Sequence, residues 1–157
     1  MSSSFELPGE LRVSELEGTH DIVGPCLIES RWKHRVRHSI NDQPAVLYRH
    51  PDTRKVFRRE WYDKGLHGRA NDLPSIIDES SEDTLSIWHE DGHVGRPRGP
   101  AVTWTAPNGI VVREEYWRRG DQPKRGVVAI ERNRYTGEET MRELVGLPGM
   151  DRFQPAP

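Results

Sequence analysis

Short apolar runs separated by polar turn segments follow one another along most of the chain. Three of these runs, PAVLY, LPSII and GPAVTW, contain or follow Pro44, Pro74 and Pro100. Proline is tolerated at the start of a strand but not in its middle, so each run is predicted to be a strand. After a polar reversal the chain returns as KVFRREW, TLSIW, IVVREEYW or ETMREL. The pattern predicts a series of β-hairpins, and Asn108-Gly109 is its strongest turn signal.

The hairpins belong to a tandem repeat. Four tryptophans recur every 27 to 29 residues: Trp32, Trp61, Trp88 and Trp117. Three glycines follow three or four residues after a tryptophan, in polar turns that require a tight reversal: Gly65, Gly92 and Gly120. A fixed period of this length indicates a repeat architecture. We therefore divide the chain into four units of strand, turn, strand and polar loop, which span 31–60, 61–87, 88–116 and 117–144.

Stacking of the units explains how so polar a chain can fold. A single hairpin cannot bury its apolar face, whereas stacked hairpins can, with each repeat tryptophan covering the next unit. The predicted fold is all-β, an elongated, twisted antiparallel meander of solenoid type. Residues 1–30 are expected to hold a degraded capping repeat, because VGPCLI resembles the GPAV segment but leaves no room for a hairpin before Trp32. Residues 145–157 are expected to form a flexible tail.

Composition agrees with a thin core. Apolar residues make up 33% of the chain and charged residues 31%, so the few large side chains matter most. The single cysteine, Cys26, rules out an internal disulfide and a cysteine-rich zinc framework. No segment has the long apolar run of a signal peptide or a membrane span, which predicts a cytoplasmic protein without a membrane partner.

The segments WYDKGLHGRANDLPSI and WHEDGHVGRPRGPAVTW, which begin at Trp61 and Trp88, carry a family resemblance. Their pattern W-Y-x-x-G-x-x-H-R followed by G-P-A-V is similar to short MORN-type repeats of bacterial and viral proteins, and covers about residues 31–144. The resemblance implies a β-hairpin array. Proteins of this kind include bacterial antitoxin and immunity proteins, alongside many phage and giant-virus products.

The most suggestive catalytic motif is HEDGH, from His89 to His93. On a helix this H-E-x-x-H spacing would place two zinc ligands and a general base on one face. Asp91-Gly92 is a turn dipeptide, however, and the flanks are strand-like, so we expect a turn and no metal site. No phosphate loop, nucleophile elbow or carboxylate pair is evident elsewhere. The sequence thus predicts a protein without cofactor and without enzymatic activity.

Two groups of residues are candidates for contacts with a partner protein. Trp104 lies mid-strand where other units have Tyr48 or an acidic residue, so it can face outward as an interface anchor beside Tyr48, although a packing role is equally compatible. A run of carboxylates can imitate phosphates before a basic nuclease surface, although loop solvation explains it equally well. This acidic group comprises Asp78, Glu79, Glu82 and Asp83. Arg54 and Arg58 are the basic candidates from the preceding unit.

These features favour a protein that neutralises a partner protein, such as a toxin, nuclease or defence effector, by occluding it. An alternative is nucleic-acid binding by residues 31–59, where seven Arg and two Lys are interleaved with Trp32, Tyr48 and Phe57. A viral structural or scaffold component is a third hypothesis. Association of copies of the chain through their sheet edges also stays open.

Overall fold

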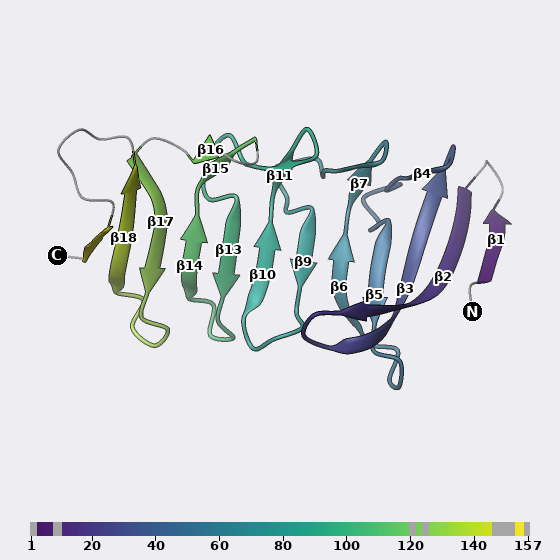
Figure 1. Ribbon diagram of the computed structural model, residues 1–157, viewed down its shortest axis with the longest axis horizontal. Coiled ribbons are helices and arrows are strands. Elements are labelled where there is room, and N and C mark those ends of the chain that lie inside the picture. The colour runs from purple at the N-terminus through teal and green to yellow at the C-terminus, as the bar shows by residue number, and fades with distance from the viewer. Residues whose placement is uncertain (1–2, 8–10, 120–121, 124–125, 146–152, 156–157) are drawn as a thin grey trace.

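A single open sheet runs the length of the molecule. The computed structural model describes residues 3–7, 11–119, 122–123, 126–145 and 153–155, and their regular structure is entirely β-strand. The main sheet has 13 antiparallel strands, and the two chain ends lie at its opposite ends (Figure 1). In spatial order the strands are β1 (Ser3–Leu7), β2 (Leu11–His20), β3 (Gly24–Lys33), β5 (Val46–Arg49), β6 (Val56–Glu60), β9 (Ile76–Asp78), β10 (Thr84–Ile87), β13 (Val102–Thr105), β14 (Val111–Glu115), β17 (Gly126–Arg132), β18 (Glu139–Val145) and β19 (Phe153–Pro155), with β4 (Val36–Arg37) paired to β3. The predicted array of hairpins in an elongated antiparallel sheet is confirmed.

Each predicted unit supplies one hairpin of this sheet, and its polar loop forms a second, much smaller hairpin. The small hairpins are β7 (Tyr62–Asp63) with β8 (Leu66–His67), β11 (His89–Glu90) with β12 (His93–Val94), and β15 (Trp117–Arg118) with β16 (Gln122–Pro123). Lys64 and Gly65 have φ of 48° and 86°, and Asp91 and Gly92 have 50° and 80°. Two successive positive φ values are typical of a type I′ turn, which explains the repeated glycine. Gly120 lies outside the described residues.

The small hairpins stack along one edge of the molecule, at the top of Figure 1. A Cβ atom built on Gly92 would lie 3.1 Å from Leu66, and one built on Gly65 would lie 3.3 Å from Val36. Each turn glycine therefore also allows close approach to the preceding unit, which a larger side chain would hinder.

The prolines of the repeat lie one residue before the most deeply buried part of each leading strand. Ala45, Ser75 and Ala101 follow the three prolines and are at most 1% exposed. Their backbone N–H groups donate to carbonyls at the end of the returning strand, at 2.8 to 2.9 Å. The register of each hairpin is thus fixed directly after Pro44, Pro74 and Pro100, as the prediction of a strand-opening proline requires.

The repeat tryptophans are not equally buried. Trp61 is 4% exposed, whereas Trp32, Trp88 and Trp117 are only partly buried. Each indole N–H nevertheless has an acceptor: Ser14 Oγ for Trp32, Asp42 O for Trp61, Asp72 O for Trp88 and Glu115 Oε2 for Trp117. The indoles therefore connect neighbouring segments by hydrogen bonds as well as by packing.

The two ends of the array differ from the predictions. VGPCLI and Trp32 belong to one continuous strand, β3, which pairs over ten residues with β2. The capping segment is therefore itself a long hairpin, formed with upstream residues whose pairing the repeat comparison did not consider. At the other end, β19 pairs with β18, so part of the predicted flexible tail adds a strand to the sheet. Residues 146–152 and 156–157 of that tail lie outside the described residues.

Candidate functional site

The strand register places one side chain from each of the strands β3, β5, β6, β9, β10, β13, β14, β17 and β18 in a single transverse row. Residues directly opposite one another on antiparallel strands point to the same face of a sheet. We call this side of the sheet the row face. From the N-terminal to the C-terminal end the row contains Ile28, Tyr48, Arg58, Asp78, Leu85, Trp104, Arg113, Glu131 and Met141.

Within this row an aromatic residue, an arginine and a carboxylate occur in the same order twice. We name Tyr48, Arg58 and Asp78 the first triplet, and Trp104, Arg113 and Glu131 the second triplet. In the first, Arg58 lies over the Tyr48 ring at 5.5 Å and bonds Asp78 at 2.9 Å. In the second, Arg113 lies over the Trp104 ring at 5.9 Å and bonds Glu131. The repeat has therefore duplicated a small recognition-type arrangement, with a larger aromatic and a longer acid in the second copy.

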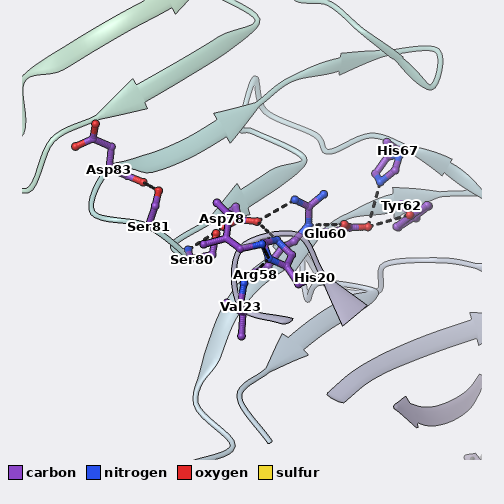
Figure 2. A network of polar contacts seen from close by, with 11 residues as sticks. His20, Val23, Arg58, Glu60, Tyr62, His67, Asp78, Ser80, Ser81 and Asp83 are labelled. Carbon is purple, nitrogen blue, oxygen red and sulfur yellow. Dashed lines mark hydrogen bonds and ion pairs between the residues drawn. The ribbon is translucent and has the colours of Figure 1, made fainter. Parts of the chain in front are cut away.

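The first triplet is covered by the chain itself. The tip of the β2–β3 hairpin, residues 20–23, folds across the sheet and brings His20 onto Asp78 (Figures 1 and 2). His20 Nε2 lies 3.0 Å from Asp78 Oδ2, and its ring makes an edge contact with Phe57 at 5.1 Å. His20 Nδ1 accepts the backbone N–H groups of Ile22 and Val23, so Nε2 carries the ring proton and donates to Asp78. The tip is thus an internal ligand of the first triplet.

The second triplet has no such cover among the described residues. In Figure 1 the hairpin tip ends beside β9, and no other described segment crosses β10, β13 or β14. The Glu131 side chain is 43% exposed, against 6% for Asp78. Arg113 bonds Glu131 through Oε1, and no contact joins Oε2 to another described residue. A partly buried indole and an available carboxylate oxygen therefore lie together on an open part of the row face.

The guanidinium groups of the two triplets are held in the same way. Arg58 Nε donates to Glu60 Oε1 at 2.7 Å, and Arg113 Nε donates to Glu115 Oε1 at 3.0 Å. Each arginine is thus fixed by a glutamate two residues further along its own strand as well as by the acid of the next unit. This fixed geometry keeps the aromatic and the carboxylate of each triplet in place before any ligand arrives.

A buried polar network continues from the first triplet toward the small hairpins, as Figure 2 shows. Glu60 is 4% exposed and also accepts from Tyr62 Oη at 3.0 Å and His67 Nε2 at 3.2 Å. Burial alone would raise the pKa of Glu60, but the bond from His67 and the charge of Arg58 outweigh it and lower the pKa to about 2. The carboxylate is therefore ionised and firmly paired at neutral pH.

His89 of the HEDGH motif belongs to the same region. Its ring stacks on His67 at 4.7 Å, and its Nδ1 lies 2.6 Å from Ser75 Oγ. Burial lowers the pKa of His89 to about 4, and the neighbouring His67 adds to the effect. His89 and His93 lie on opposite strands of the small β11–β12 hairpin, with Asp91-Gly92 at its turn. The prediction of a turn in place of a zinc-binding helix is confirmed.

The structure separates the residues that the sequence grouped as acidic contacts. Asp78 is 4% exposed and bonded to Arg58 and His20, which corrects its expected place on an open acidic surface. The physical reason is the register, because Asp78 occupies the row between Arg58 and Leu85. Glu79 is paired with Arg59, and Glu82 and Asp83 both contact Arg134. These carboxylates do not form one unpaired patch.

The aromatic candidates lie on the same face but not together. Tyr48 and Trp104 are separated by four strand spacings, roughly 19 Å at the usual distance between strands. The expectation that they lie side by side is therefore wrong, because three other strands of the row come between them. Tyr48 lies beneath the hairpin tip, with its ring 6.1 Å from that of His20. Of these two aromatic residues, Trp104 is the one that no described segment covers.

Most arginines of the basic segment 31–59 form ion pairs with carboxylates of the same chain. Arg54 bonds Glu15 at 2.9 Å, and Arg58 is paired with Glu60 and Asp78. Further pairs join Arg31 and Arg49 to Glu29, and Arg59 to Glu79. Phe57 is only 2% exposed and is not available as a stacking platform for a base. The geometry thus gives less support to a nucleic-acid surface here than the sequence did.

Sequence reasoning missed a contact that connects neighbouring units, which we call the clasp. Arg69 lies over the Trp61 ring at 3.7 Å and donates two hydrogen bonds to Asp42 of the preceding unit. In the next copy, Arg96 lies over Trp88 at 4.2 Å and donates two bonds to Asp72. The signal was present as an Asn-Asp pair ahead of Pro44 and Pro74 and as an arginine eight residues after Trp61 and Trp88.

The clasps line open grooves between successive small hairpins. The groove beside Trp61 has a volume of about 430 Å³, and the groove beside Trp88 has about 390 Å³. Their central charged groups, Arg69 with Asp42 and Arg96 with Asp72, are already paired with each other. The clasps therefore serve the cohesion of the array, and the second triplet is the better candidate for recognition.

No protein-family model, curated protein or solved structure matches the chain. The resemblance to MORN-type repeats accordingly stays a prediction from the quoted motifs. The described part of the chain contains no helix with the length and apolarity needed to cross a membrane.

Proposed function

We propose that the protein is a non-enzymatic binding protein that holds a partner protein against the second triplet and neutralises it by occlusion. One observation carries the proposal. The same aromatic–arginine–carboxylate arrangement is present twice, and the chain fills the first copy with its own hairpin tip while no described segment covers the second copy. An arrangement that binds a protein segment within the molecule has the chemistry to bind one from another molecule.

The chemistry of the second triplet fits a protein interface. Tryptophan and arginine are the residues most often found as energetic anchors of such interfaces. Trp104 is flanked in the row by Leu85, and Glu131 by Met141, so an apolar border surrounds the charged pair. Arg113 is already fixed by Glu115 and Glu131, so little side-chain freedom is lost on binding. The sheet beneath it provides a preorganised surface.

The arrangement most similar to a catalytic pair supports a structural role instead. Ser75 Oγ and His89 Nδ1 are within hydrogen-bond distance, but Ser75 is 1% exposed and its hydroxyl also donates to Ile87 O at 3.2 Å. A nucleophile needs access to its substrate, which this hydroxyl lacks. We therefore assign the pair to the cohesion between the second and third units.

Affinity capture with matched surface variants tests the proposal. The wild-type protein, Trp104→Ala, Glu131→Ala and the control Tyr135→Ala are used to capture proteins from the lysate of the native organism. Tyr135 is an 82% exposed aromatic outside the row, so it reports on non-specific adhesion. We expect one protein to be captured by the wild type and the control and to be lost with both triplet variants, with a loss of about 2 kcal/mol for Trp104→Ala in calorimetry of the purified pair.

Inhibition of the captured partner completes the test. Addition of the wild-type protein should suppress the activity of the purified partner, and Trp104→Ala should restore that activity at the same concentration. Capture that is equal for wild type and both triplet variants, or a bound partner that keeps its full activity, would contradict the proposal.

A further inference from the structure

The chain's own hairpin tip indicates what kind of segment the open triplet accepts. We infer that the second triplet binds a surface turn of the partner protein that presents a planar hydrogen-bond donor, the imidazole of histidine or the guanidinium of arginine. The donor lies against the Trp104 ring and bonds Glu131 Oε2, the carboxylate oxygen that no other described residue contacts. The inference rests on the proposed function and specifies the chemistry of the partner.

The first triplet shows which contacts such a turn makes. The His20 ring donates from Nε2 to Asp78 and places its edge against two aromatic rings, those of Phe57 and Tyr48. Its other nitrogen accepts two backbone N–H groups of the tip and so closes the turn. Of the two aliphatic residues of the tip, Ile22 is 64% exposed, whereas Val23 is partly buried. The planar donor of His20 therefore supplies the polar contacts of the tip, and Ile22 at its apex contributes little to its binding.

The second triplet offers an aromatic ring and a carboxylate in a more accessible form, with Val112 in the place of Phe57. Trp104 presents a larger ring than Tyr48, and planar cations stack well on indole. Glu131 is one methylene longer than Asp78, and its side chain is 43% exposed, so the carboxylate extends further toward a molecule that arrives from outside. Arg113 engages Oε1 of this carboxylate, and none of the described residues contacts Oε2, which can accept from a second donor.

Charge favours a cationic or donating ligand over an anionic one. The three charged groups at the site, Arg113, Glu115 and Glu131, sum to one negative charge. The guanidinium of Arg113 is occupied on all three nitrogens by these two carboxylates. An incoming carboxylate or phosphate would therefore meet two carboxylates and an arginine whose charge they already balance, whereas imidazolium or guanidinium would meet complementary charge.

The test uses a probe from the chain itself. A backbone-cyclised peptide of residues 18–25, which contains the tip, is added to the isotope-labelled full-length protein while NMR spectra are recorded. The Trp104 indole N–H signal is identified from its absence in Trp104→Phe. We expect shifts at this signal and at the amides of Arg113 and Glu131, with a dissociation constant of about 1 mM, since one turn makes few contacts.

Three variants test the specificity of that binding. The peptide with His20→Ala and the protein with Glu131→Ala should each bind about tenfold more weakly, whereas a peptide with His20→Arg should keep the interaction. Shifts confined to Tyr48 and Phe57 would mean that the peptide only displaces the tip from the first triplet, and would overturn the inference. Absence of any shift at the second triplet would overturn it as well.

Failure of the inference can be separated from failure of the proposed function. If capture of a partner depends on Trp104 but the peptide shifts no NMR signal of the second triplet, the proposed binding function stands. The inference that the bound segment is a turn with a planar donor is then wrong. If capture does not depend on Trp104, the function itself fails whatever the peptide does.

Discussion

Acidification should lower the free energy of unfolding in two separate pH ranges, the upper one set by His89 and the lower one by Glu60. Glu60 has an ordinary pKa of 4.5 that falls to about 2 in the folded state, and it is 4% exposed. A folded-state pKa below the unfolded value means that the unfolded chain binds the proton more readily as the pH falls. The carboxylate therefore contributes full stability above about pH 4.5 and loses this contribution as the pH falls toward 2.

The magnitude follows from the size of the shift. One pKa unit corresponds to about 1.4 kcal/mol, so the difference at Glu60 is about 3 kcal/mol, of which about 2 kcal/mol is lost by pH 3. His89 acts at higher pH, because its pKa falls from 6.5 to about 4 through burial. Its unfolded form takes up a proton between about pH 6.5 and 4 while the folded form stays neutral, which again lowers stability on acidification. Since the ring is partly exposed, solvent screening reduces this step to about 1 to 2 kcal/mol.

Urea unfolding followed by tryptophan fluorescence at a series of pH values measures both steps. Glu60→Gln should remove the lower step and also weaken the protein at neutral pH, because Arg58 and His67 lose their charged acceptor. His89→Phe keeps a flat ring against His67 and should remove only the upper step. Each variant is the control for the other. If the difference in unfolding free energy between wild type and Glu60→Gln stays constant from pH 7 to pH 3, the assigned role of Glu60 in acid unfolding is refuted.

Three further substitutions test the connections between units. Arg96→Ala removes two hydrogen bonds to Asp72, one to Pro100 O and the contact with the Trp88 ring. It should lower the unfolding free energy measured in urea titrations by about 2 to 3 kcal/mol. The control Arg98→Ala in the same loop should change this free energy by less than about 0.5 kcal/mol. In thermal unfolding, Gly92→Ala should lower the unfolding free energy by about 2 kcal/mol and Gly109→Ala by about 1 kcal/mol. Both glycines have a positive φ, but only at position 92 would the new Cβ press against Leu66. Equal losses of unfolding free energy would contradict close stacking of the small hairpins. His20→Ala should cost about 1 to 3 kcal/mol and speed amide hydrogen exchange in residues 20–23, because Asp78 loses a donor; unchanged exchange would show that the tip is held by other contacts.

The local part of the fold was predictable from the sequence because its signals act over a few residues. Trp61 and Trp88 mark the period, and the Asp91-Gly92 dipeptide defines a turn whatever the rest of the chain does. The same holds for the strand openings at proline. Steric limits on φ leave few alternatives at these positions, so the array of hairpins followed from pattern alone.

The candidate site was only partly predictable because it depends on register and on distant pairing. Trp104 was identified from its odd place in the repeat, but its partners Arg113 and Glu131 became visible only when the strands were aligned. The cover of the first triplet could not be read from sequence, since His20 and Asp78 are 58 residues apart. A contact between residues so far apart produces no repeating pattern in the sequence. It depends on how the β2–β3 hairpin bends across the sheet.

The clasps also give the array a direction. Asp42 of one unit holds Arg69 of the next, and Asp72 then holds Arg96. Unit 61–87 offers an acid, Asp72, to its successor and an arginine, Arg69, to its predecessor, so its two boundaries match. Loss of 61–87 would bring Asp42 to Arg96 and restore the same contact, so duplication or deletion of this unit can lengthen or shorten the array without a change in the contacts at its boundaries. Binding surfaces on the row face can then change their spacing in steps of one hairpin while cohesion is preserved.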